Sequence, residues 1–245
     1  MIPIRDDAPR YSTPYVNYFI IGLNTIVFLL MWLGIPAGAQ QVVNTFGFEP
    51  IRVTALLRGA DAIQVQGGAL VPINAASAIV TAFTSMFMHG GWLHLIFNMW
   101  ALWIFGDNIE DYLGHFPYLV FYLIAGLAGD ALHTIMNPTS AIPSVGASGA
   151  IAGVMGAYMV LYPNARVTTL VPFFFIFFIR LPAWLVLGYW FIVQFLSGAA
   201  MSIAYTRQNS GGIAFWAHVG GFVTGLLLIK VFPARVRRAV RFSGW

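Results

Sequence analysis

Long apolar stretches separated by short polar ones dominate the sequence. No charged residue lies between Arg10 and Glu49, or between Asp61 and Asp107. A helix needs roughly 20 apolar residues to cross about 30 Å of hydrocarbon. The pattern predicts six spans, at about residues 15–33, 92–106, 116–136, 148–162, 181–204 and 213–232. We therefore expect an all-α membrane protein, a six-helix bundle that forms a single domain over residues 1–245.

Three segments outside these spans carry expectations of their own. The long first loop, residues 34–91, has a polar middle followed by an apolar run, so we expect it to dip partly into the membrane. The run LVPFFFIFFI at 170–179 is too short to cross, and we expect it at the interface or inside the bundle. Residues 233–245 form a basic tail.

Composition and charge refine this picture. Only 8% of the residues are charged, against about 25% in soluble domains. An even number of spans places both termini on one side, and the side richer in Lys and Arg is normally cytoplasmic. Nine of the 12 basic residues then lie inside, five of them within 230–241. We expect cytoplasmic termini, in a cell's inner or plasma membrane.

The same charge distribution bears on partners. The net charge of +4 reflects topology and contact with anionic lipid, and we expect no nucleic-acid partner. The chain has no cysteine, which excludes disulfide and thiol chemistry. The sequence leaves the oligomeric state open.

Polar side chains inside predicted spans are costly and often mark function. His94 and Asn98 are four residues apart in the second span, so they share one helix face. Ser148 begins the fourth span and His218 lies in the sixth. His89 lies five residues before His94, and we expect it in the loop that precedes the span.

Small residues explain how these groups could meet. Glycines four residues apart occur at 149–153 and 221–225, a spacing that lets two helices approach closely. Two such faces in contact would bring Ser148 to His218. The positions also agree in depth, because His94, Ser148 and His218 precede the expected helix ends at Asp107, Pro163 and Pro233 by 13, 15 and 15 residues.

That count, at about 1.5 Å per residue, places all three groups roughly 20–22 Å above the cytoplasmic boundary. Polar groups at this depth require a water-filled cavity, which we expect to open to the non-cytoplasmic side. Taken singly, each group has a simpler reading: a serine can bond to the carbonyl four residues back, and histidines often join membrane helices. Their convergence favours a site.

The residue types predict acyl transfer. Ser148 would be the nucleophile and His218 its general base, a dyad without an acid. The Ser148 backbone N–H, with the His94 and Asn98 side chains, would stabilise the oxyanion. The sequence has no H-E-x-x-H zinc motif, and Asp107 and Asp130 lie at different levels, so neither a metal site nor an aspartate pair is indicated. We expect no cofactor.

The strings HGGWLHLIFN, GASG and AHVGG, in this order on the second, fourth and sixth spans, resemble those of the rhomboid family of intramembrane serine proteases. The resemblance covers roughly residues 15–232. It implies the roles assigned above and substrates that are transmembrane helices cut near their outer ends. It also implies supporting roles for Glu110 as a structural acid, Phe97 as a gate or specificity residue, His89 under the first loop, and Gly146.

Two positions depart from the pattern of many members. Ala152 stands where an aromatic residue usually packs on the catalytic histidine, so Phe215, Trp216 or a residue of another span must hold His218. The pair at 80–81 is Val-Thr where a Trp-Arg pair is common, which affects how the first loop is anchored.

Trp190 and Gln194 of the fifth span are candidates to flank the path of the substrate. Two other functions stay open from the sequence. One is a catalytically silent rhomboid-like protein that binds membrane clients. The other is a small channel or transporter whose transport would survive Ser148→Ala.

Overall fold

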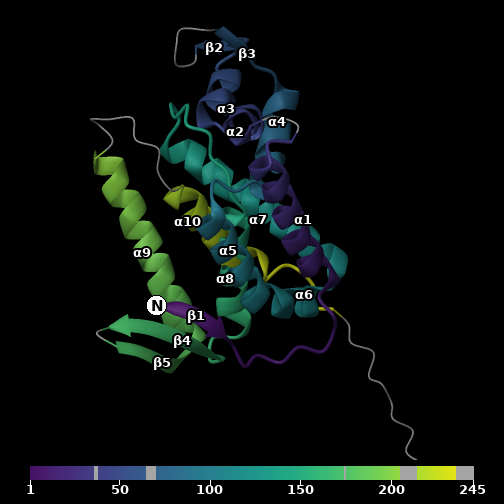
Figure 1. Ribbon diagram of the computed structural model, residues 1–245, viewed down its shortest axis with the longest axis vertical. Helices are drawn as coiled ribbons and strands as arrows, with labels where there is room; N and C mark the ends of the chain where they lie inside the picture. Colours follow the sequence, from purple (N-terminus) through teal and green to yellow (C-terminus); the bar gives the residue numbers. More distant parts are fainter. Residues whose placement is uncertain (36–37, 65–69, 174, 205–213, 236–245) are drawn as a thin grey trace, which may run out of the picture.

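Most of the chain is helical, as the apolar pattern predicts. The computed structural model describes residues 1–35, 38–64, 70–173, 175–204 and 214–235. The predicted tail beyond residue 235 and residue 213 of the predicted last span lie outside them. Within the described residues, three helices are long and apolar enough to cross a membrane: α1 (Tyr15–Trp32), α7 (His115–Met136) and α9 (Ala183–Ala204). Two shorter apolar helices are α8 (Ser148–Leu161) and α10 (Phe215–Leu228) (Figure 1).

The second predicted span belongs to a longer helical segment. It comprises α5 (Trp92–Ala101), the π-helical turn η2 (Leu102–Gly106) and α6 (Asp107–Leu113). The expected helix end at Asp107 is therefore wrong, because the helical backbone continues to Leu113 and the chain turns only at Gly114, where φ is 86°. This segment and the preceding α4 (Ala75–Thr84) with η1 (Ser85–Phe87) are bent by 82° and form a fourth candidate span.

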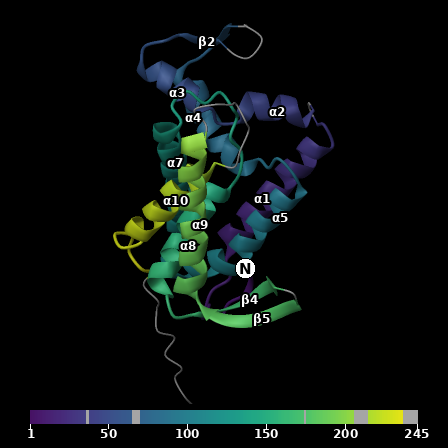
Figure 2. The ribbon, with the colours of Figure 1, turned by 90° about the vertical axis from the view of Figure 1, so that its left-hand side faces the viewer.

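The first loop is folded. It contains α2 (Ala39–Phe46), α3 (Pro50–Leu57), the hairpin β2 (Ala62–Gln64) and β3 (Leu70–Pro72), and α4. Asn74 begins α4 with a capping box in which its side chain accepts from the Ser77 N–H at 2.8 Å. In both ribbon views these elements lie at one end of the molecule (Figures 1 and 2). Partial membrane insertion of this loop stays a prediction.

A three-stranded antiparallel sheet lies at the other end (Figure 2). Its order is β1 (Ile2–Arg5), β4 (Arg166–Phe173) and β5 (Phe175–Pro182). The exception to the predicted all-α class is the hairpin of β4 and β5, which contains most of the apolar run at 170–179. Its Val, Thr, Ile and Phe residues favour strands, and pairing with β1 gives β4 a partner on its second edge at residues 168–170.

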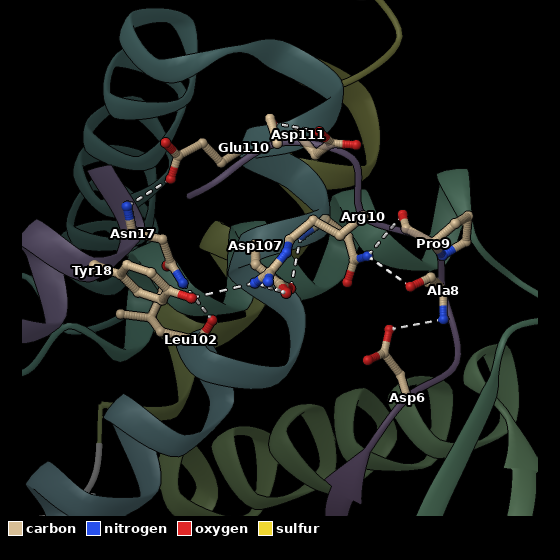
Figure 3. Close-up of polar contacts among 12 residues, drawn as sticks. Asp6, Ala8, Pro9, Arg10, Asn17, Tyr18, Leu102, Asp107, Glu110 and Asp111 are labelled. Atoms are coloured by element: carbon tan, nitrogen blue, oxygen red, sulfur yellow. Dashed lines mark hydrogen bonds and ion pairs between the residues drawn. The ribbon is translucent and has the colours of Figure 1, made fainter. Parts of the chain in front are cut away.

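The segment between β1 and α1 is tied to α6 by polar contacts (Figure 3). Glu110 is fully buried and accepts hydrogen bonds from the backbone N–H groups of Val16 and Asn17 at 3.0 and 2.7 Å. It thereby satisfies first-turn donors of α1, which have no helical partner. Nearby, the Tyr158 hydroxyl donates to Asp6, and burial raises the pKa of that carboxyl group.

The core is centred on α8, where small residues let the helices touch. A Cβ on Gly221 would overlap the Gly149 carbonyl oxygen, and one on Gly225 would overlap that of Gly153. The glycine faces at 149–153 and 221–225 therefore pack together as predicted. Because His218 lies one turn before Gly221, this contact sets how closely α10 brings its histidine to the start of α8.

Candidate active site

Ser148 and His218 meet at the end of the glycine contact. The Ser148 Oγ lies 2.6 Å from the His218 Nε2, within hydrogen-bond distance. Ser148 is the first residue of α8, and His218 lies in the first turn of α10 with only 7% of its surface exposed. A hydroxyl at this distance from a ring nitrogen has the geometry of a serine activated by a general base.

The loop before α8 fixes the position of the Ser148 backbone. Gly146 has φ at 140°, a conformation that favours glycine. A Cβ there would lie 2.8 Å from His94 Cε1, so a larger residue would also collide with that ring. The Gly146 N–H donates to the Ser85 carbonyl at 2.9 Å, which fixes the loop. The Ser148 N–H is a first-turn donor without a helical acceptor.

The other predicted oxyanion residues lie on α5. The Asn98 side chain is buried, and its Nδ2 donates to the His94 carbonyl at 2.9 Å, one turn back. The His89 ring lies edge-on to the His94 ring with centroids 5.0 Å apart. His89 is buried and packs against the His94 ring, and its supporting role stays a prediction.

One cavity joins these groups. Its volume is about 1310 Å³, and its wall includes Ser148, His218, His94, Asn98 and residues of α5, α8, α9 and β1. The cavity runs from the serine to Met1, Ile2 and Pro3 at the sheet. It is therefore large enough to hold several residues of a peptide beside the serine.

Three side chains contact the His218 ring, and none of them comes from Ala152 of α8. The His218 Nδ1 lies 2.8 Å from the Gln194 Oε1, and the Trp190 ring lies 5.8 Å from the His218 ring. Phe215 makes an edge contact with centroids 6.4 Å apart. Trp216 does not hold the ring in this way, since its Nε1 donates to the Ser202 Oγ at 2.9 Å.

Acidic groups and metal ligands are sparse in this region. Asp130 of α7 lines the cavity, and its Oδ2 has no hydrogen-bond partner among the residues that the structure describes. It is Gln194 that faces the His218 Nδ1, so this carboxyl group does not complete a triad. No group of three or more His, Asp or Glu side chains in the described part of the chain could hold a metal ion.

Comparison with known proteins agrees with this geometry. The family model of the rhomboid domain matches residues 76–235, which include every residue of the candidate site. The chain belongs to the rhomboid family.

Named relatives come from several kingdoms. The chain is 32% identical to the mitochondrial rhomboid protein 1 of Saccharomyces cerevisiae, over 60% of this chain and 40% of that protein. It is 30% identical to the mitochondrial RHOMBOID-like protein 6 of Arabidopsis thaliana, over 77% and 55%. It is 41% identical to the rhomboid protease GluP of Bacillus subtilis, over 31% and 14%. The matched region thus spans about half or less of these relatives.

The remaining residues implied by the rhomboid motifs fall into two groups. Phe97 lies on the cavity wall with 54% of its surface exposed, and its role as a gate or specificity residue stays a prediction. Glu110 lies away from the cavity and joins α6 to α1. At the second departure from the rhomboid pattern, Val80 is half-exposed and Thr81 is buried, with its hydroxyl donating to the Ala78 carbonyl at 3.1 Å.

The structure adds a contact that the sequence did not assign. Trp190 and Gln194 line the cavity, consistent with the expected path of the substrate, but both also touch His218. Their spacing of four residues on one face of α9 was the available signal. The sequence alone did not show that this face would contact His218, because the contact depends on how α9 packs on α10.

Proposed function

We propose that this chain is an intramembrane serine endopeptidase that cleaves peptide bonds in or near the transmembrane segments of other membrane proteins. The observation that carries the proposal is the 2.6 Å contact between Ser148 Oγ and His218 Nε2 on the wall of a cavity shared with His94 and Asn98. Family membership supports the same reaction class.

The chemistry follows from the positions of these groups. The Ser148 Oγ attacks the scissile carbonyl carbon while its proton passes to the His218 Nε2. The resulting oxyanion is held by the Ser148 N–H with His94 and Asn98. The imidazolium then protonates the leaving amine, which leaves an acyl-enzyme on Ser148. Water, deprotonated by the same histidine, releases the new carboxyl end.

The membrane placement is part of the proposal. We assign six spans, formed by α1, the α5–α6 segment, α7, α8, α9 and α10. Both α8 and α10 have 14 residues, which cover roughly 21 Å and fall short of a core of about 30 Å. A short span starts below the membrane surface, so Ser148 and His218 would lie within the membrane, on the wall of the cavity, and we propose that this cavity opens to the non-cytoplasmic side.

Substrate and location are proposed on the same grounds. The substrate is a transmembrane helix that unwinds beside Ser148, because an intact helix engages its carbonyl groups in hydrogen bonds. The sheet and the basic residues near 230–235 lie on the cytoplasmic side of a cell's inner or plasma membrane. Two of the relatives above are named mitochondrial, and fractionation of the source cell tests the location.

The test is labelling of the purified protein in detergent with a tagged fluorophosphonate, beside Ser148→Ala and His218→Ala. We expect labelling of the unmodified chain alone, and cleavage of a single-span reporter with Gly and Pro near its outer end. Both variants should retain the melting temperature of the unmodified chain within a few degrees. A folded protein that takes no label would instead favour the silent, client-binding alternative, and reporter cleavage by Ser148→Ala would refute the proposal.

A further inference from the structure

The hydrogen bond between Gln194 and His218 carries information about the proton on the imidazole ring. The atom of Gln194 that faces the ring is the carbonyl oxygen Oε1, 2.8 Å from Nδ1. An amide oxygen only accepts hydrogen bonds, so this contact is a hydrogen bond when Nδ1 carries the proton. In a neutral ring the other nitrogen, Nε2, is then unprotonated.

This tautomer is the one that a general base needs. The Nε2 lies 2.6 Å from the Ser148 Oγ and can accept its proton only if it is unprotonated. The opposite tautomer would donate a hydrogen bond to the serine oxygen and leave the hydroxyl inactive. Selection of the tautomer is a task that a carboxylate performs in serine protease triads.

We propose that Gln194 is a positioning residue that holds His218 in its active tautomer and orientation, as a neutral third member after Ser148 and His218. The inference rests on the function proposed above. A neutral amide suits this place, because a carboxylate inside a membrane is costly. The amide dipole also favours the imidazolium that forms during attack, without adding a charge to the resting site.

A second residue of α9, Trp190, also contacts the His218 ring. Trp190, one turn before Gln194, lies on the His218 ring with centroids 5.8 Å apart at an interplanar angle of 36°. The ring is thus held on one face by Trp190 and at one nitrogen by Gln194. Together they take over the positioning that an aromatic residue at Ala152 would provide.

The test compares three variants of α9 in the full chain. Gln194→Leu removes the acceptor at similar volume, and Gln194→Glu keeps an oxygen at the same place. Tyr189→Phe is the control, because Tyr189 lies on the same helix with 51% of its surface exposed and is not part of the cavity wall.

We expect kcat for the single-span reporter to fall about 10- to 100-fold in Gln194→Leu, the range that loss of a hydrogen bond to a buried polar group produces. KM should change less than about threefold. Gln194→Glu should retain most of the activity, and Tyr189→Phe all of it. A change in KM alone would show that Gln194 only contacts substrate, and would overturn the proposal.

A second readout does not depend on catalysis. Nitrogen-15 spectra of histidine-labelled protein distinguish protonated from unprotonated ring nitrogens, and comparison with His218→Ala assigns the His218 signals. We expect a protonated Nδ1 in the unmodified chain and a mixed or reversed tautomer in Gln194→Leu. An unchanged tautomer in Gln194→Leu would overturn the proposal while leaving the endopeptidase function intact. Reporter cleavage by Ser148→Ala would refute that function instead.

Discussion

Substitution of Gly221 by alanine tests whether the contact between α8 and α10 sets the distance between Ser148 and His218. A Cβ at this position would lie far inside the 3.0 Å that real Cβ atoms keep from the Gly149 carbonyl oxygen. Both groups are backbone or backbone-attached, so neither can rotate away. The axes of α8 and α10 must therefore separate, by about 1 Å, in the turn that follows His218.

The magnitude follows from the geometry of the site. The Ser148 Oγ–His218 Nε2 distance is 2.6 Å, and an increase of about 1 Å takes it beyond the range in which a hydrogen bond forms. Misplacement by that amount typically costs about 100-fold in rate. Overpacking of this kind costs about 1–3 kcal/mol of stability, so most molecules should remain folded and the loss of activity should exceed any loss of folded protein.

The assay measures the fluorophosphonate labelling rate and reporter cleavage per folded molecule, with folding followed by thermal denaturation in detergent. Gly188→Ala on α9 is the matched control, because a Cβ there has no atom within 4 Å; it should be neutral or stabilising by up to about 1 kcal/mol. The reasoning is refuted if Gly221→Ala labels and cleaves at the rate of the unmodified chain.

Two further predictions concern the polar contacts of α6 and the first residues. Glu110→Gln should lower the free energy of unfolding by about 2–3 kcal/mol, because a buried carboxylate that accepts two backbone hydrogen bonds is replaced; thermal denaturation measures this, and labelling per folded molecule should not change. Asp6→Asn should stabilise the chain most at neutral pH and progressively less in acid. Burial raises the pKa of Asp6, so the folded state binds its proton more tightly and this residue's contribution to stability falls as pH rises through that pKa. A difference in Tm between Asp6→Asn and the unmodified chain that grows toward acid pH would contradict this sign.

Much of the architecture could be predicted from local pattern. The limits of α1, α7, α8 and α9 follow from runs of apolar residues, since these runs have few other stable arrangements in a membrane. The contact of the glycine faces at 149–153 and 221–225 followed from spacing alone, because small residues at that interval allow close approach. Once those faces met, Ser148 and His218 had to lie near each other.

Other features depend on partners distant in the sequence. The hairpin at 166–182 was missed because strand pairing with residues 2–5 cannot be deduced from an apolar run too short to span. The helix end expected at Asp107 was wrong because a charged residue can end an apolar span without ending the helix, which continues here to Leu113 and stops at Gly114.

The sequence by itself determined the membrane class, the candidate residues Ser148 and His218 and the helices that carry them, because each depends on residue type and short-range periodicity. The tertiary structure decided what holds His218 in the absence of an aromatic residue at Ala152. Gln194 lies 24 residues from His218 along the chain, and only the packing of α9 against α10 turns its amide oxygen toward the imidazole ring. Hydrogen bonds between helices depend on rotation about each helix axis, which local sequence does not specify.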